Sequence, residues 1–351
     1  LSWDLSVNSR GLDLPPLGER LRGRLRGSFR SHGTASASEL EIAVQAIDLR
    51  GEVNGLPATI EGHFGLRDAA LLEGSDLRAE LNGARLDLGP AADGDAGSQL
   101  RLVVDDLGRW LADSRGELHL RASVGRRGGH YRVDGGFSDV VWRGLAVSEG
   151  SLRGRYAPAR ESAFDISLAL SNVAARGAVL DSLTIDAAGD RGRQRLRLQS
   201  AGALVGALEV AGETTQQAWS GRLAPADLTV GAMQWSLSQP VALQWSAAER
   251  RLEVQPHCWR HGEARLCAGT WSVGASGEGT LELTADAALL QSLMPAPTSL
   301  DGTLKASAAV RWRPRTGVRG EAQFEASPLV LTRSLPEGER AEVRWTRAGG
   351  H

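Results

Sequence analysis

The most specific chemistry in this sequence belongs to its two cysteines, Cys258 and Cys267. If Gly262-Glu263 is the loop of a β-hairpin, glycine occupies the first loop position, which suits a type II′ turn. Counting outward from that loop puts the cysteines opposite each other in a non-hydrogen-bonded pair, where Cα atoms lie about 4.5 Å apart. That separation is at the short end of the range that a disulfide accepts. The sequence therefore predicts a Cys258–Cys267 disulfide, and with it an oxidising compartment such as the periplasm or the cell exterior.

The same hairpin register separates the neighbouring side chains by polarity, which supports it. One face is expected to hold Leu252, Val254, Pro256, Cys258, Cys267, Gly269, Trp271 and Val273. The opposite face is expected to hold Arg251, Glu253, Gln255, His257, Ala268, Thr270 and Ser272.

Two alternatives to the disulfide are a pair of ordinary buried thiols, which stays open, and a metal site. His257 and His261 stand beside Cys258, but strand alternation puts both on the face opposite the thiols. Their spacing also fits no zinc pattern. We therefore expect no metal and no cofactor.

The residues needed for catalysis or for nucleic-acid binding do not form recognisable motifs. Asp and Glu are scattered along polar strand faces, and no His joins a Ser or Cys in a nucleophile motif. The formal net charge of −2 gives no field that would recruit nucleic acid, and no basic stripe accompanies the tryptophans of 235–245. The expectation is a protein that is not an enzyme and binds no nucleic acid.

The elements that must position these residues are strands, because apolar residues alternate with polar ones along most of the 351 residues. The clearest apolar series are Leu40, Ile42, Val44 and Ala46; Leu118, Leu120, Ala122 and Val124; Phe164, Ile166, Leu168 and Leu170; Leu183, Ile185 and Ala187; Leu281, Leu283 and Ala285; and Leu304, Ala306, Ala308, Val310 and Trp312. Turn signals such as Asn54-Gly55 and Asn82-Gly83 separate the runs, at spacings typical of a meander of hairpins.

Two short helices are expected, at residues 105–113 and 286–294. Each begins with an Asp at the N-cap and continues with apolar residues at helical spacing. A similar strand follows each one, at residues 116–124 and 302–310. We therefore predict one elongated repetitive unit over residues 1–351, with possible module boundaries near the two helices.

No apolar run approaches the roughly 18 residues that span a bilayer. The chain begins with Leu and shows no signal peptide, so we expect it to be an internal piece of a longer protein. Any membrane anchor is then expected outside this chain.

The motifs around the cysteines resemble the central region of the TamB family (translocation and assembly module subunit TamB, within the AsmA-like or repeating β-groove superfamily). The family pattern is Ser-x-Pro-x-x-Leu-x-Trp on one strand, found here at 238–245, then Cys-Trp at 258–259 and Leu-Cys at 266–267. Ala-Ser-Gly at 275–277 and a Leu-x-x-Leu segment ending at Pro295 continue the likeness.

The resemblance implies an all-β fold: an elongated, curled, mostly antiparallel sheet, or β-taco, here with two short helices. It implies a periplasmic segment of a protein anchored in the inner membrane. Its interior would be a hydrophobic groove for phospholipid transport between the inner and outer membranes, for assembly of outer-membrane β-barrel proteins and autotransporters, or for both. The implied partners are phospholipid acyl chains or unfolded outer-membrane protein strands. A TamA-like outer-membrane barrel would bind through a region outside this chain.

The residues expected to line this groove are the apolar members of the alternating runs. They are Leu40, Ile42, Val44, Leu118, Leu120, Val124, Phe164, Ile166, Leu168, Leu170, Leu281, Leu283, Leu304 and Val310. Alternation alone does not separate an open groove from a sealed core. A second alternative is an extracellular β-solenoid passenger, either an adhesin or a protein acting on polysaccharide, although the regular short coils and clustered carboxylates of such proteins are not visible.

Overall fold

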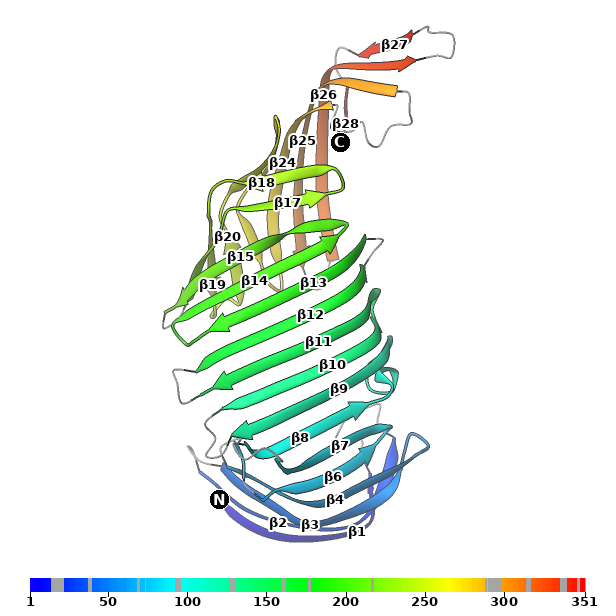
Figure 1. Ribbon diagram of the computed structural model, residues 1–351, viewed down its shortest axis with the longest axis vertical. Helices are drawn as coiled ribbons and strands as arrows, with labels where there is room; N and C mark the ends of the chain where they lie inside the picture. The colour runs from blue at the N-terminus through cyan, green and yellow to red at the C-terminus, as the bar shows by residue number, and fades with distance from the viewer. Residues whose placement is uncertain are drawn as a thin grey trace. The chain divides into compact units, whose positions relative to one another are not determined.

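The computed structural model describes most of the chain. The described residues are 1–13, 22–36, 40–67, 70–72, 74–91, 96–125, 130–158, 162–175, 178–215, 218–287, 289, 298–313, 317–334, 340–345 and 348–350. They form 28 β-strands, and every strand pairing described is antiparallel (Figure 1). The expected all-β antiparallel architecture is confirmed.

The strands divide between two compact units. Unit 1 comprises Leu1–Arg191 with Ser200–Ala203, and unit 2 comprises Gly192–Gln199 with Leu204–His351. The strands of unit 1 are β1 (Ser2–Asp13), β2 (Gly23–Ala35), β3 (Leu40–Val53), β4 (Leu56–Arg67), β5 (Ala70–Leu71), β6 (Asp76–Leu81), β7 (Ala84–Pro90), β8 (Ala96–Val104), β9 (Ser114–Gly125), β10 (Tyr131–Trp142), β11 (Leu145–Ala157), β12 (Ala163–Ala175) and β13 (Ala178–Gly189).

Strand β14 (Arg193–Gly202) has residues in both units. The strands of unit 2 are β15 (Leu204–Thr214), β16 (Ala218–Leu223), β17 (Ala226–Val230), β18 (Met233–Leu237), β19 (Val241–Ser246), β20 (Arg251–Val254), β21 (His257–His261), β22 (Ala264–Ala268), β23 (Trp271–Val273), β24 (Gly277–Asp286), β25 (Thr298–Arg313), β26 (Gly317–Ser334), β27 (Arg340–Trp345) and β28 (Ala348–Gly350). The expectation of one repetitive unit with module boundaries near 105–113 and 286–294 stays a prediction.

Unit 1 is a meander whose strands bend at β-bulges. In β3 the register shifts between Val44 and Ile47, and Ala46 within that bulge has a φ of 52°. The extra residue changes which face the following side chains occupy. It keeps Val44 on the same side of the sheet as Ile47 and Leu49, although their spacing breaks the period of two. Ala46, which the alternation placed with Val44, therefore leaves that face and is exposed.

The first expected helix, at 105–113, is reduced to a single 3-10 turn, η2 (Leu107–Arg109). Asp106 is the N-cap, as predicted, and its side chain accepts a hydrogen bond from the Gly108 amide at 2.9 Å. Glycine inside the first turn disfavours continuation of a helix. Asp113, with a φ of 55°, leads directly into β9, so the segment is too short to hold a regular helix.

The second expected helix falls mostly outside the described residues. Its proposed N-cap, Asp286, is the last residue of β24, and an N-cap residue commonly has such an extended backbone. The next described residues, Ala287 and Leu289, are in 3-10 conformation. The helix itself stays a prediction. Positions 288 and 290–294 lie in the part of the chain that is not described.

A compact hydrophobic cluster forms a buried core in the part of unit 1 that contains β2, β3 and β4. Its buried members are Leu25, Ile47, Leu49, Val53 and Ala58, and Trp110, next to η2, packs against them. A chain of hydrogen bonds joins the turns beside it: Asn54 donates to the Asn82 side chain at 3.0 Å, and Asn82 donates to the Arg109 carbonyl at 2.9 Å. The two predicted Asn-Gly turns therefore also fasten η2 in place.

Unit 2 contains a region in which each crossing of the sheet is split into two short strands. The uninterrupted strand β15 pairs with both β16 and β17, and β24 pairs with both β22 and β23. Between them, one path runs through β16, β19, β20 and β23, and the other through β17, β18, β21 and β22. Three of the four interruptions contain a proline, namely Pro225, Pro240 and Pro256. Proline lacks an N–H group for the ladder, so the strands stop there.

Candidate functional site

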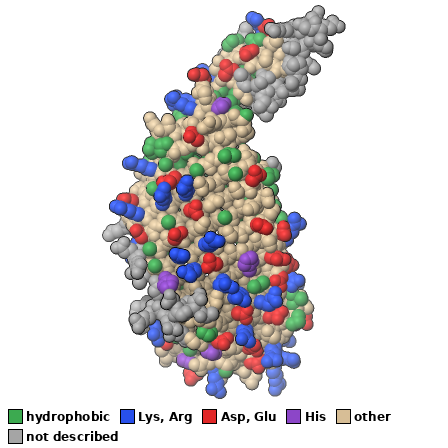
Figure 2. All heavy atoms as spheres, in the orientation of Figure 1, with side chains coloured by type: hydrophobic (Ala, Val, Ile, Leu, Met, Phe, Trp, Pro, Cys, Tyr) green, Lys and Arg blue, Asp and Glu red, His purple; other side chains and the backbone are tan. Residues whose placement is uncertain are grey.

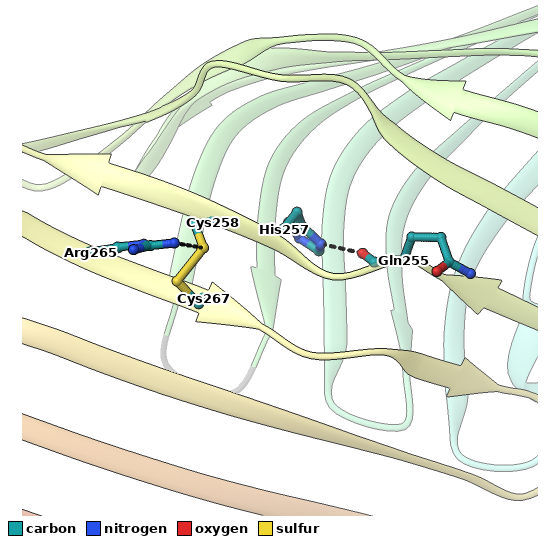
Figure 3. Close-up of a disulfide and its surroundings, with 5 residues drawn as sticks. All are labelled: Gln255, His257, Cys258, Arg265 and Cys267. Atoms are coloured by element: carbon teal, nitrogen blue, oxygen red, sulfur yellow. Dashed lines mark hydrogen bonds between the residues drawn. A yellow bond between two sulfur atoms is a disulfide. The ribbon is translucent and has the colours of Figure 1, made fainter.

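The predicted disulfide is present in the structure and links β21 to β22. Cys258 and Cys267 are directly paired, with their Cα atoms 4.0 Å apart. Gly262 takes a φ of 54° at the first position of the two-residue loop, as the predicted turn requires. The guanidinium of Arg265 donates a hydrogen bond to the sulfur of Cys258 at 3.2 Å (Figure 3).

The predicted pairing is confirmed beyond the hairpin as well, but the predicted faces are wrong. Val254 pairs with Trp271, as expected, whereas Cys267 pairs with Glu282 and its neighbour Leu266 pairs with Leu283. The disulfide thus lies on the polar face, opposite Leu283. The physical reason is that the strands are interrupted at 255–256 and at 269–270. At each interruption the strand changes which of its alternate residues face the apolar side. Because both paired strands change together, the pairing is kept, but Cys258 and Cys267 lie on the face opposite Val254 and Trp271.

The two histidines point away from the disulfide, as the alternation predicts. The ring of His257 contacts the Gln255 carbonyl at 2.9 Å, and the ring of His261 contacts the Gln234 carbonyl at 2.9 Å (Figure 3 for His257). Within the described ranges, no three His, Cys, Asp or Glu side chains come together as metal ligands.

Apolar side chains in β9–β13 form rows across the strands, because directly paired residues share a face. One row is Leu118, Phe137, Gly150, Leu170 and Leu183. The next is Leu120, Gly135, Leu152, Leu168 and Ile185. The outermost is Val124, Tyr131, Tyr156, Phe164 and Gly189. We call the side that carries these rows the apolar face of unit 1.

The same face extends from β9 back to β3. The second row continues from Leu120 through Leu102, Leu86, Ala79 and Ile60 to Leu49. All ten groove residues expected in this unit lie on the apolar face: Leu40, Ile42, Val44, Leu118, Leu120, Val124, Phe164, Ile166, Leu168 and Leu170. That they line a path for cargo stays a prediction.

None of these ten side chains is fully buried. Leu40 is 44% exposed and Ile166 is 41% exposed, while the others are partly exposed. A single layer of sheet thus carries a broad hydrocarbon surface that water reaches. Contiguous exposed apolar surface of this kind marks a binding site in most proteins.

Unit 2 has an apolar face of its own in β24 and β25. Leu281 pairs with Ala308, Leu283 pairs with Ala306, and Leu304 pairs with Ala285. Val310 pairs with Gly279, which belongs to the same side of β24. The four groove residues expected here, Leu281, Leu283, Leu304 and Val310, therefore share one face and are partly exposed.

Aromatic rings lying over glycines are a feature of the apolar faces that alternation did not predict. The ring of Phe137 lies over Gly150, and the ring of Trp271 lies over Gly279, leaving no room for a side chain at either glycine. Trp219 covers Gly221 in the same way. The signal in the sequence was glycine at an inward position of an otherwise apolar strand, which marks a close approach by a neighbour.

The opposite face carries alternating charges. Acidic and basic side chains are interspersed over the surface in view in Figure 2. Most of the ion pairs are well exposed, as between Arg195 and Glu209 at 2.6 Å. The hydrogen bond from Arg195 lowers the pKa of the Glu209 carboxyl. Such exposed pairs add little stability, so this face serves mainly as a solvated surface.

These observations define a class: an antiparallel β-sheet scaffold with one apolar and one charged face. Over residues 1–348 the chain matches the family model described as TamB, N-terminal domain. The chain therefore belongs to the TamB family. The matching model carries the name of the N-terminal domain, whereas the motifs around the cysteines pointed to a central region.

No solved structure matches the chain. Among the described residues, no helix has the length and hydrophobicity of a transmembrane span.

Proposed function

We propose that each apolar face forms a trough for phospholipid acyl chains moving between the inner and outer membranes. The chain would act in the periplasm, as part of a protein that a segment outside it anchors in the inner membrane. A TamA-like barrel would bind through another region of that protein. Family membership supports this setting over an extracellular passenger.

The observation that carries the proposal is the set of parallel rows on the apolar face of unit 1. Neighbouring rows present similar alkyl walls, such as Leu118 with Leu170 and Leu120 with Leu168. Burying one methylene group is worth about 0.8 kcal/mol, so a 16-carbon chain gains on the order of 10 kcal/mol in such an environment. Since adjacent positions offer nearly the same gain, a lipid would slide without meeting a deep trap.

The partial exposure of these rows supports an open trough over a sealed core. A core side chain is normally shielded on all sides, because interiors are close-packed. Ile166 at 41% exposure lacks such a shield, and acyl chains would supply it. Bound acyl chains would therefore cover apolar surface that the fold leaves exposed to water.

Photocrosslinking in cells tests the cargo. A photoreactive amino acid at Leu168 is expected to capture phospholipid, identified by mass spectrometry of the adduct. Ala169 is the matched control, because it is the next residue of β12 and faces the charged side, paired with Ser151 and Thr184. Capture of unfolded outer-membrane protein at Leu168, with no lipid, would replace lipid by protein as the cargo.

The Leu168→Arg substitution tests the path. An unpaired charge in an apolar environment costs several kcal/mol, so lipid passage is expected to stop at that point. Transport in cells and urea denaturation are measured on the same variant, with Ala169→Arg as the control on the charged face. A stable Leu168→Arg protein that still supports full transport would overturn the trough.

A further inference from the structure

One end of the apolar face of unit 1 carries tyrosines where leucine and valine prevail elsewhere. Tyr131 and Tyr156 are directly paired near the ends of β10 and β11, and their rings stack with centroids 6.0 Å apart. Val124 and Phe164 flank them in the same row. A pocket of about 320 Å³ opens at this place, lined by both tyrosines and by Phe164. Tyr156 is 42% exposed, so the rings are open to a ligand.

Two arginines line the same pocket from the charged side of the strands. Arg132 and Arg155 are directly paired, which puts two like charges opposite each other. Within the described part of the chain, neither forms an ion pair with a carboxylate, although Asp165 lies opposite Arg155 in the register and also lines the pocket. Like charges directly opposite each other destabilise a sheet, and an anion bound by both guanidinium groups would relieve that repulsion.

The neighbouring row on the same face provides a comparison. There Asp134 stands between Arg121 and Arg153, and it is directly paired with both. An acidic side chain thus separates the two arginines one row further along the strands. Arg121 also lies directly opposite Arg101, and Arg26 lies opposite Arg50 elsewhere in unit 1. What sets Arg132 and Arg155 apart is the pocket that they line beside the aromatic rings.

We propose that Tyr131, Tyr156 and Phe164, together with Arg132 and Arg155, form a loading site for a glycerophospholipid. The site rests on the proposed function and gives it a point of access. Tyrosine suits the boundary between headgroup and hydrocarbon, because its ring is apolar and its hydroxyl is polar. Guanidinium groups bind phosphate through two parallel hydrogen bonds. The phosphodiester would bind the arginines, and the acyl chains would pass the rings toward Leu168.

The test measures lipid uptake by the purified chain from phosphatidylglycerol vesicles that contain pyrene-labelled phosphatidylglycerol. The variant R132Q/R155Q is expected to slow uptake about tenfold, because charge-assisted hydrogen bonds to the phosphate are lost. R121Q/R153Q is the matched control, since it removes the same charge from the same face of β9 and β11. Its uptake is expected to stay within about twofold of the unmodified chain.

A second probe separates headgroup recognition from general attraction to the vesicle. Pyrene-labelled diacylglycerol has the chains but no phosphate, so R132Q/R155Q is expected to take it up at the normal rate. Tyr156→Ala is expected to slow the uptake of both lipids, because the ring contacts chain and glycerol.

The outcomes distinguish the site from the function. If the unmodified chain takes up neither lipid, the proposed function fails and the loading site fails with it. If the unmodified chain takes up lipid and R132Q/R155Q does so equally well, the loading site is overturned while the trough stands. An equal loss in R121Q/R153Q would also overturn it, because the effect would then follow total charge and not position.

Discussion

Two regions of unit 1 use the same alternating pattern and reach opposite states of burial. In β2–β4, Leu25 is 1% exposed and Val53 is fully buried. In β12, Ile166 is 41% exposed although it occupies an equivalent inward position. The difference is a second layer: the turn at η2 brings Trp110 onto the cluster around Leu25. Alternation therefore sets which face is apolar, and covering segments decide whether that face becomes a core.

The comparison predicts its largest effect for matched truncations of leucine. Leu25→Ala is expected to lower the free energy of unfolding by about 3 to 4 kcal/mol, because it leaves a cavity in a packed cluster. Leu168→Ala is expected to cost only about 1 kcal/mol, since part of that side chain is already in water. Urea denaturation of the two variants measures both values. Equal losses would mean that the β9–β12 face is also a sealed core.

The strands and the apolar face were predictable because alternation is a local property of the sequence. Leu118, Leu168 and Leu283 occupy the side that their spacing indicates. What alternation could not predict is where the phase changes. At Ala46 one extra residue reverses the alternation, and an alanine side chain gives no sign that the residue has a positive φ.

The hairpin at the cysteines shows the same limit. Its pairing followed from Gly262 and from counting, and the disulfide followed from the pairing. The face of the sheet that carries the disulfide could not be predicted in this way. It depends on the interruptions at 255–256 and 269–270, which arise because neighbouring strands are interrupted together. Pro225, Pro240 and Pro256 were the available signal, although Pro240 and Pro256 were expected to lie within strands.

The second prediction contrasts continuous strands with interrupted ones. In unit 1 the strands β9–β12 are each continuous over 12 or 13 residues. The interrupted strands of unit 2 are 3 to 6 residues long, and the disulfide links two of them, β21 and β22. The double variant C258S/C267S is expected to lose about 2 to 3 kcal/mol, because the bond closes a short loop. Hydrogen exchange should rise in β20–β23 and stay unchanged in β9–β12.

Thiol titration provides the control for the disulfide. The denatured, unreduced protein is expected to show no free thiol, and two after reduction. Two free thiols before reduction would contradict the bond. A uniform rise of exchange in both regions would show instead that the fastening is not local.

The smallest expected effect is at the bulge that keeps β3 in phase, and there the sign is the informative quantity. Ala46 is an exposed alanine with a φ of 52°, a conformation that costs a residue with a Cβ roughly 1 to 2 kcal/mol. Ala46→Gly removes that cost at the price of a more flexible unfolded chain, so a net gain of about 0.5 to 1 kcal/mol is expected. Ala43→Gly is the matched control in the same strand, at a position paired with His32 and Gly65, and it is expected to lose about 0.5 to 1 kcal/mol.

Urea denaturation of both variants gives the sign of each change in stability. If Ala46→Gly destabilises as much as Ala43→Gly, the bulge does not hold Ala46 in the left-handed region. Val44 and Ile47 would then lie on opposite faces of the sheet. The buried cluster around Leu25 and the exposed apolar face would in that case no longer be parts of the same face.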